Sequence, residues 1–278
     1  MKTSVIVSVY KNTSALKAVL DSLKNQTVKN FEIIISEDAQ GDAMRQFVEE
    51  YPFCNPHQHI TQKDLGWRKN RALNRAIEQS TGEWLIFIDG DCVLHPRFVE
   101  FHMRMAQSGY ILAGKRVKLN ATHSQMLLDD LSYMSRLNGI LIRQTLMLKP
   151  KEGNKFCEEG IFLDPDSFPW GIIPRLRRMR MLKGCNMSFA RDAIYAINGF
   201  DMDYVRPAVG EDIDICWRFK ATGYKIRSLR NMAVQYHLFH KENWSDQSEN
   251  LLLMKSKQSA GETVCRNGLA QLKDSQDH

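Results

Sequence analysis

Two aspartates follow a strongly apolar segment in WLIFIDGDC, residues 84–92. The unbroken apolar run before Asp89 and Asp91 predicts a strand covered on both faces that ends in two carboxylates. Like charges in a small volume repel each other unless a cation or hydrogen-bond donors accompany them. A divalent ion such as Mg²⁺ takes hard oxygen ligands and keeps open positions that a diphosphate can fill. We therefore interpret D-G-D as a metal and diphosphate site, with a solvated turn as the alternative.

Two further groups of side chains could serve the same chemistry. The segment GEDIDI, residues 210–215, carries three acids, although acids in the first turn of a helix also complement its dipole. The segment YHLFH carries His237 and His240 in apolar surroundings, where a histidine is usually a packed core residue. If a cation binds at Asp91, one of these histidines becomes a nitrogen ligand. Carboxylate plus imidazole suits Mn²⁺ somewhat better than Mg²⁺.

Alternating strand and helix signals in the first hundred residues would position these groups. Strands are predicted at 4–10, 31–35, 57–62 and 84–88, and helices after Thr13 and Ser14, after Gly41 and over 68–79. This alternation predicts an α/β fold with a mostly parallel central sheet and helices on both faces. Ligands of such sheets bind at the carboxyl ends of the strands. The acids that end the second and fourth strands should therefore meet at one edge; they are Glu37, Asp38, Asp89 and Asp91.

The remainder of the chain is less regular. The pattern predicts a helix over 124–148, a long irregular insertion over 150–183, and a strand followed by a short helix over 184–200. The last predicted elements are a helix over 210–223 that ends at Gly223, a pair of strands over 224–238, and a polar helix from 244 that fades into a frayed end.

Composition narrows the class of protein. The 278 residues are 43% hydrophobic, contain no apolar run long enough to span a bilayer, and show no secretory leader. Six scattered cysteines without a C-x-x-C pair indicate reduced thiols, so we expect a cytoplasmic protein. Five cations in residues 174–184 fit acidic headgroups or phosphates, or simply a solvated face. We expect no nucleic-acid partner, because no binding module or aromatic ladder accompanies this charge.

Seven motifs in order resemble glycosyltransferase family 2 over roughly 1–100 and 184–240. They are SVIVSVYKN, IIISEDAQGD, QKDLGWRKNRALNRAI, GEWLIFIDGDCVLHP, GCNMSFARD, NGFD and GEDIDICWR. Residues 184–218 also resemble the C-terminal module of β-galactosyltransferases and chondroitin-type polymerases. The resemblance implies a GT-A-type nucleotide-diphospho-sugar transferase fold and inverting, Mn²⁺- or Mg²⁺-dependent transfer. The donor would be a UDP-sugar, and the acceptor a glycan or lipid-linked saccharide for bacterial surface polysaccharide, met at the inner face of the cell membrane.

The resemblance also implies roles for individual residues. Asp212 would be the general base beside Glu211, and Asp91, Asp89 and His237 would hold the metal. The implied donor-binding residues are Val9, Tyr10, Glu37, Asp38, Asp64, Gly66, Arg68, Lys69, Asp89, Gly90, Gly184 and Asn186. Glu37 would meet the base or ribose ahead of Asp38. Two departures from the family pattern, E-D-A-Q in place of D-D-G-S and PAVGED in place of Trp-Gly-Gly before Glu-Asp, leave the identity of the sugar open.

The expected organisation is a nucleotide-sugar-binding half over 1–123, an insertion over 124–183, an acceptor and metal-completing half over 184–245, and a helical tail over 246–278. A dehydrogenase is disfavoured, because no glycine-rich turn follows the first strand. Two alternatives remain at this stage. One is a nucleotidyltransferase, which would release pyrophosphate, and the other is a non-catalytic sugar-nucleotide-binding protein.

Overall fold

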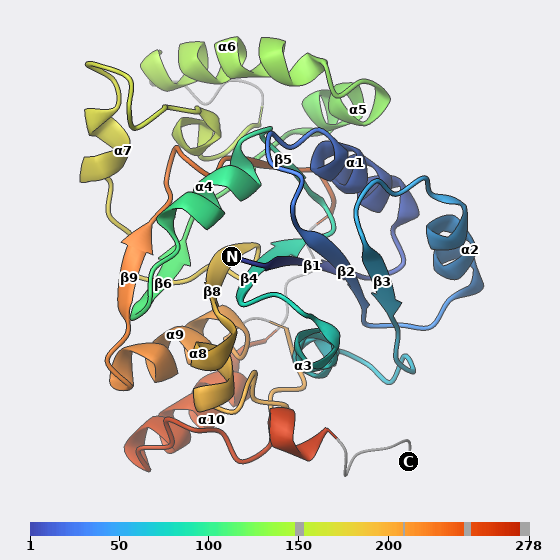
Figure 1. The fold of residues 1–278 in the computed structure, drawn as a ribbon, viewed down its shortest axis with the longest axis vertical. Helices are drawn as coiled ribbons and strands as arrows, with labels where there is room; N and C mark the ends of the chain where they lie inside the picture. Colours follow the sequence, from blue (N-terminus) through green and yellow to red (C-terminus); the bar gives the residue numbers. More distant parts are fainter. Residues whose placement is uncertain (148–152, 208, 242–245, 273–278) are drawn as a thin grey trace.

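The central sheet has the strand order β3-β2-β1-β4-β8-β6-β9 (Figure 1). This computed structural model of the chain describes residues 1–147, 153–207, 209–241 and 246–272. The first four strands are parallel where they pair, and they match the four predicted ones: β1 (Thr3–Val9), β2 (Glu32–Glu37), β3 (His57–Ile60) and β4 (Trp84–Asp89). The predicted α/β class with a mostly parallel sheet is therefore confirmed in this half of the molecule.

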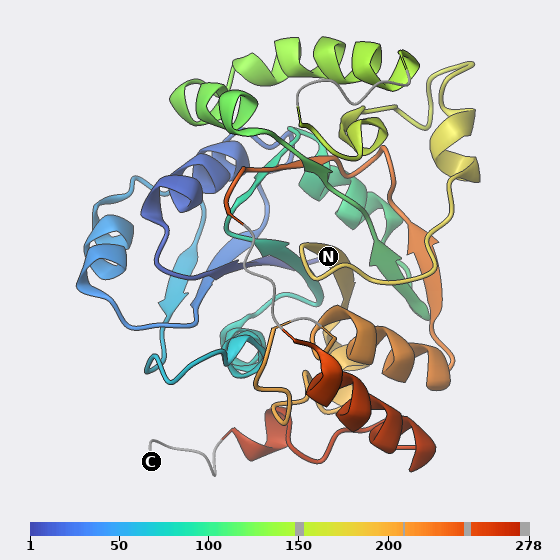
Figure 2. The same ribbon diagram turned by 180° about the vertical axis from the view of Figure 1, so that it is seen from behind.

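Helices cover both faces of this sheet, as predicted (Figures 1 and 2). On one face, side chains of α1 (Thr13–Lys24), α2 (Asp42–Glu50) and α4 (Phe98–Met105) pack against alternate residues of β1, β2 and β4. On the other face pack α3 (Lys69–Gln79), α8 (Arg191–Ala196) and α9 (Asp212–Ala221). The cap of α1 is Asn12, one residue before the predicted cap at Thr13 and Ser14, because the Asn12 side chain accepts the Ala15 N–H at 3.0 Å.

The second half of the sheet is mixed. Strand β8 (Asn186–Ala190) runs antiparallel between β4 and β6 (Tyr110–Ala113), and β9 (Lys225–Ser228) lies at the edge, parallel to β6. The predicted strand and short helix over 184–200 are β8 and α8. This arrangement lays the segment before β8 directly beside the end of β4, although about a hundred residues separate them. The glycine that ends α9, Gly223, has a positive φ of 92°, as its position predicted.

Both strands predicted over 224–238 are present, but they do not pair with each other. Only β9 joins the large sheet; β10 (Gln235–His237) lies in a second sheet between β5 (Cys92–Leu94) and β7 (Val117–Lys118). The connecting residues 229–234 are too apolar to form an exposed hairpin turn. The four apolar residues among them are buried: Leu229, Met232, Ala233 and Val234. The chain therefore crosses from one sheet to the other instead of turning back.

The helix predicted over 124–148 is two helices, α5 (Ala121–Asp129) and α6 (Tyr133–Leu146). Asp130 separates them, because its carboxylate accepts the backbone N–H and the hydroxyl of Ser132 and so replaces helical hydrogen bonds with a local turn. Apolar side chains of α5 and α6 pack on the second sheet. Residue 148, where the prediction ended, lies outside the described residues.

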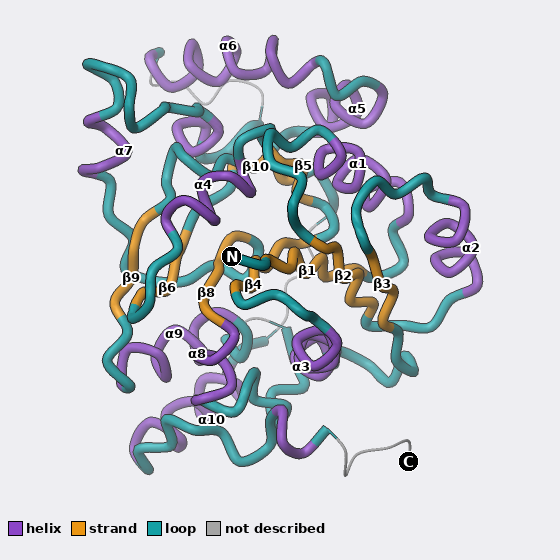
Figure 3. Tube along the Cα trace, viewed as in Figure 1, coloured by secondary structure: helices purple, strands orange, loops and turns teal. Residues whose placement is uncertain are grey.

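The predicted irregular insertion holds only short helices within 153–183: η1 (Cys157–Gly160) and α7 (Ile172–Leu176) (Figure 3). The buried carboxylate of Glu159 forms salt bridges with Arg177, at 3.0 Å, and with Arg230. The pair with Arg230 connects the insertion to the loop after β9. The tail forms α10 (Ser248–Ser259) and η2 (Leu269–Gln271). The proposed boundary at 245/246 touches residues 242–245, and the frayed end covers 273–278; both lie outside the described residues.

Candidate active site

A cavity of about 590 Å³ opens at the carboxyl ends of β1 and β4. Strand register explains why the predicted residues meet there, since Ser8 of β1 pairs with Asp89 and Val9 pairs with Glu37. Nine of the predicted donor- or metal-binding residues line it: Val9, Tyr10, Asp38, Asp64, Gly66, Lys69, Asp89, Gly90 and Asp91. Gly90 is required at its position, because a Cβ there would lie 2.6 Å from the Val9 side chain.

Asp89 is neutralised by the protein's own cations. Lys69 Nζ lies 2.8 Å from Asp89 Oδ1, and Arg116 Nη1 lies 3.0 Å from Oδ2. Burial alone would lower the pKa of Lys69, but the carboxylates of Asp89 and Glu211 outweigh it and raise that pKa. Lys69 and Arg116 therefore stay charged and occupy both oxygens of Asp89.

Asp91 has different partners. The Nε2 atoms of His237 and His240 each lie 3.4 Å from Asp91 Oδ2, and these two nitrogens are 3.2 Å apart. Pairing of β10 with β5 places His237 beside Cys92, and the Leu238 N–H donates to the Asp91 carbonyl at 2.9 Å. The second sheet thus fixes both histidines next to the aspartate.

These three atoms fit a small divalent cation. Ligand atoms about 2.1 Å from a shared ion lie about 3.0 Å apart in an octahedral site and about 3.4 Å apart in a tetrahedral one. The observed separations of 3.2 to 3.4 Å fall in that range. His240 Nδ1 lies 3.2 Å from the Lys241 carbonyl, a contact that leaves Nε2 as the ligand atom. Although burial favours the neutral acid, the two histidines hold the pKa of Asp91 below its usual range.

The predicted catalytic pair lies at the start of α9. Lys69 Nζ lies 2.7 Å from Glu211 Oε1, so one lysine joins the end of β4 to the acid before α9. Burial raises the pKa of Glu211 despite this lysine. Asp212 is the first residue of the helix, and Lys183 Nζ lies 3.7 Å from its Oδ2. Neither acid is among the residues that line the cavity; Glu211 is connected to it through Lys69.

Gly184 lies against Glu211. A Cβ on residue 184 would be 2.0 Å from Glu211 Oε1, so a side chain here would displace that carboxylate. We expected close approach of a ligand at this glycine, and the structure shows close approach of a predicted catalytic side chain.

The other end of the cavity carries Asp38 and Asp64. Asp38 accepts the Gln62 amide at 2.6 Å and the Arg68 backbone N–H at 2.8 Å, and burial raises its pKa. Asp64 is more exposed and pairs with Lys11 at 2.6 Å. Tyr10 donates its hydroxyl to Asp64 at 3.2 Å. This end therefore offers polar groups beside the exposed ring of Tyr10, a surface that suits a base and a ribose.

Comparison with known proteins decides the family. The family model described as glycosyl transferase family 2 matches residues 4–163, more than half of the chain. The chain belongs to glycosyl transferase family 2. Residues 184–218 lie beyond that match, so their likeness to a galactosyltransferase module stays a prediction.

Individual relatives agree with this assignment. The chain is 38% identical to EpsH of Bacillus subtilis over 190 residues, which cover 67% of this chain and 49% of EpsH. It is 22% identical to the amylovoran biosynthesis glycosyltransferase AmsB of Erwinia amylovora, over 84% of this chain and 69% of AmsB. The chain thus spans about half the length of EpsH and two thirds of AmsB.

A solved structure shares the fold. The mannosyltransferase PcManGT of Pyrobaculum calidifontis, in complex with GDP-Man and Mn²⁺, superimposes with a TM-score of 0.58 at 16% identity. The match covers 93% of this chain and 64% of PcManGT. The expected GT-A-type fold is confirmed. In the described parts of this family 2 chain, no helix combines the length and apolarity that a membrane span needs.

Three further predicted donor-binding residues of this family 2 chain, Glu37, Arg68 and Asn186, are not among those that line the cavity. The carboxylate of Glu37 is buried and meets His59 Nε2 at 2.8 Å, away from the cavity. The Asn186 amide donates to the carbonyls of Lys115 and Ala233, both at 3.0 Å, inside the protein. Arg68 precedes α3, and its backbone rather than its side chain reaches Asp38. Ligand roles for these side chains stay predictions.

Some residues at the site had no functional prediction. Ser8, Asn12 and Trp67 line the cavity, and Arg116 pairs with Asp89. Arg116 follows β6 and carries no motif; only the position of β6 beside β8 brings it to the end of β4. His240 is a second candidate metal ligand in the sequence, although the family resemblance implies His237 for that role. Its spacing of three residues from His237 was the available signal, and the second sheet makes both converge on Asp91.

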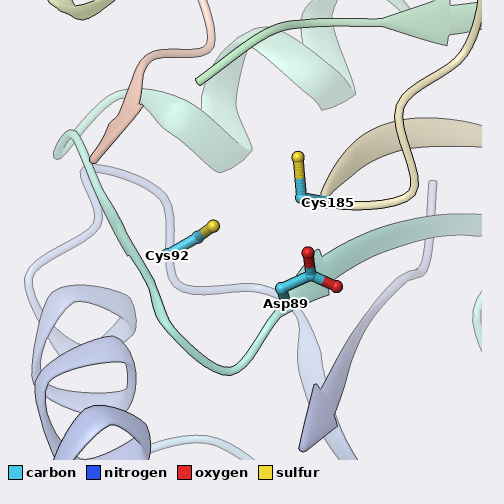
Figure 4. A group of neighbouring side chains, drawn as sticks. All are labelled: Asp89, Cys92 and Cys185. Atoms are coloured by element: carbon cyan, nitrogen blue, oxygen red, sulfur yellow. The ribbon is translucent and has the colours of Figure 1, made fainter. Parts of the chain in front are cut away.

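A second cluster borders the same site, formed by Asp89, Cys92 and Cys185 (Figure 4). Figure 4 shows the side chains approaching from the end of β4, from β5 and from the segment before β8. Their ligand atoms lie within 4.8 Å of one another. Lys69 and Arg116 occupy both Asp89 oxygens, and burial raises the pKa of the Cys92 thiol. Two fixed cations and a protonated thiol make this cluster a poor cation site. All six cysteines are free thiols, as predicted.

Proposed function

We propose that this family 2 chain transfers a sugar, with inversion, from a nucleoside-diphosphate donor to a saccharide hydroxyl. One observation carries the proposal: three ligand atoms of Asp91, His237 and His240 converge beside a cavity at the carboxyl edge of the sheet. Family membership gives the reaction class, and the ligand set gives the place where the diphosphate would bind. UDP is the donor nucleotide that the sequence resemblance favours.

In this proposal the donor lies along the cavity, with its base and ribose near Tyr10, Asp38 and Asp64. Asp91, His237 and His240 would hold Mn²⁺ or Mg²⁺, and a bound ion would supply positive charge to stabilise the departing diphosphate. Lys69 adds a fixed positive charge at the end of β4. Arg116 holds Asp89 in place from its other oxygen, so in this proposal Asp89 orients these two cations rather than binding the metal.

The acceptor side is the start of α9. Asp212 takes the proton from the acceptor hydroxyl as its oxygen attacks the anomeric carbon. The bond from that carbon to the phosphate oxygen breaks in the same step, and the nucleoside diphosphate leaves with the electron pair. Glu211, held by Lys69, orients the acceptor beside the donor. No covalent intermediate is needed for inversion.

We further propose a lipid-linked saccharide or a growing surface polysaccharide as the acceptor. The support is the resemblance of residues 184–218 to acceptor modules, together with the relation to EpsH and to AmsB. Such an acceptor would be met at the inner face of the cell membrane. The sugar transferred and the linkage formed are open in this proposal.

The decisive experiment is a donor screen with Mn²⁺. Thermal shift would first find the nucleotide sugar that raises the melting temperature, because a ligand that binds only the folded state stabilises it. Product analysis would follow with that donor and candidate acceptors. Release of nucleoside diphosphate supports the proposal, whereas release of pyrophosphate would identify a nucleotidyltransferase.

Matched variants separate binding from chemistry. Asp91→Asn should lose Mn²⁺-dependent stabilisation, and Asp212→Asn should keep it while losing transfer. Donor stabilisation without turnover by the unaltered chain, across acceptors, would favour a non-catalytic sugar-nucleotide-binding protein and overturn the proposal.

A further inference from the structure

A row of large apolar side chains stands exposed around α7. Phe168, Trp170, Ile172 and Leu176 are 94%, 63%, 60% and 73% exposed, respectively. We call these four residues the α7 ridge. Isolated exposed apolar residues are common on protein surfaces, but four large ones within nine residues are not. The transfer chemistry proposed above uses none of them.

The α7 ridge is held firmly by the residues around it. Pro174 is buried, and backbone hydrogen bonds join Ile173 to Trp170 and Arg177 to Ile173 at 3.1 Å each. Arg177 then connects this segment to the buried Glu159 at 3.0 Å. The four apolar side chains are thus presented outward by an anchored segment.

A basic groove of about 900 Å³ lies next to the α7 ridge, between α7 and the edge strand β9. Six cationic side chains line it: Arg104, Arg175, Arg177, Arg178, Lys225 and Arg227. Among the described lining residues Asp166 is the one acid, and it pairs with Arg104 and Arg175. Arg175 belongs to α7 itself, and Arg178 follows it closely. The groove therefore keeps a net positive charge directly beside the exposed apolar side chains.

We propose that the α7 ridge and the basic groove together form a docking surface for an anionic lipid bilayer. Arginine binds lipid phosphates at the depth of the headgroups, while tryptophan, phenylalanine and aliphatic side chains insert at the boundary with the acyl chains. A soluble polyanion would use the groove but would leave the ridge in water. A second copy of the chain would bring two positive grooves together. An anionic bilayer offers phosphates to the basic groove and an apolar layer to the α7 ridge.

The location fits an enzyme that acts on membrane-bound acceptors. Figures 1 and 2 place α7 at the periphery, far from α10 at the other end of the molecule. This deepens the proposed function by naming the surface that would meet a lipid-linked acceptor. Bilayer binding is nevertheless a separate property, because no residue of the surface lines the donor cavity.

Vesicle co-sedimentation tests the proposal with the full chain at low ionic strength. We expect binding to vesicles of phosphatidylcholine with phosphatidylglycerol, and little binding to phosphatidylcholine alone. Removing two cations with Arg175→Gln/Arg178→Gln should weaken binding about 25-fold, since each is worth about fivefold near an anionic surface. Phe168→Ala/Trp170→Ala should weaken it at least about 100-fold, because full insertion of each of these two side chains is worth more than about tenfold.

The matched control is Leu251→Ala/Leu252→Ala, which removes two exposed apolar side chains from α10. It should bind vesicles like the unaltered chain, and all three double variants should keep donor-dependent stabilisation. Absence of binding to anionic vesicles, or equal loss in the α10 control, would overturn the docking surface. If the ridge variant instead abolished a dimer seen by analytical ultracentrifugation, the surface would join copies of the chain and the bilayer proposal would be wrong. Both outcomes are independent of sugar transfer.

Discussion

Replacing Gly184 with alanine offers a sharp test of the role proposed for Glu211. The new Cβ would lie 2.0 Å from Glu211 Oε1, and real Cβ contacts below 3.0 Å essentially never occur, so this oxygen must move by about 1 Å. Lys69 Nζ lies 2.7 Å from the same oxygen. A displacement of about 1 Å would therefore break or greatly weaken their hydrogen bond.

The expected consequence is a loss of turnover in a folded protein. The atoms that must yield belong to the end of a flexible side chain, and Lys69 keeps its contact with Asp89 at 2.8 Å. The free energy of unfolding should therefore fall by no more than about 1.5–3 kcal/mol, the usual contribution of one hydrogen bond between charged groups. A misplacement of about 1 Å at reacting groups typically costs about 10²-fold in rate, so kcat should fall by about that factor. Donor-induced stabilisation should remain.

The assay measures release of nucleoside diphosphate with saturating donor and acceptor, alongside urea unfolding. Gly139→Ala is the matched control: it lies in α6, and a Cβ there meets nothing within 4 Å. That control should keep full activity and gain up to about 1 kcal/mol in stability. Turnover of a folded Gly184→Ala variant at the normal rate would show that the position of the Glu211 carboxylate does not matter for transfer.

Further predictions concern the metal site, the charge network and a buried histidine. His240→Ala should weaken Mn²⁺ binding at least about tenfold in calorimetry without donor, because mutating even a residue that only orients a metal ligand typically lowers metal affinity by about tenfold or more. Unchanged affinity would show that His240 is not a ligand. Lys69→Met should lower the free energy of unfolding by about 3 kcal/mol, since it leaves Glu211 without its counter-charge, and adding Glu211→Gln should restore part of that loss in urea titrations. Burial lowers the pKa of His102 from 6.5 to about 3, so the unfolded chain binds more protons between these values and stability must fall as pH falls through 6.5. Between pH 7 and pH 5 this one group should lower the free energy of unfolding by about 2 kcal/mol, and this loss should be missing in His102→Gln. An equal dependence of the free energy of unfolding on pH in both proteins would contradict the prediction.

Local patterns allowed much of the fold to be predicted. Strands β1 to β4 and the helices between them follow from apolar runs and helical periodicity, because each must bury a contiguous set of side chains. The site at their ends follows from the same reasoning, since parallel strands bring their carboxyl ends to one edge. That is why Asp38, Asp89 and Asp91 line one cavity as expected.

Predictions failed where the structure depends on contacts that the local sequence pattern does not encode. The second sheet could not be foreseen, because β5 and β7 have only three and two residues and pair with β10 from far along the chain. The break at Asp130 was missed, because a local side-chain turn overrode a continuous apolar pattern. The direction of the Glu37 carboxylate depends on His59 of the neighbouring strand β3, a contact that no periodicity encodes.

By itself, then, the sequence determined the kind of chemistry: that β1 to β4 form, which acids end them, and which histidines are available. Tertiary structure alone decided how charge is shared. In the folded chain Asp89 pairs with Lys69 and Arg116, whereas Asp91 lies next to His237 and His240. The physical reason is that the position of a carboxylate's partners depends on sheet order and register, and these are set by packing between segments more than a hundred residues apart.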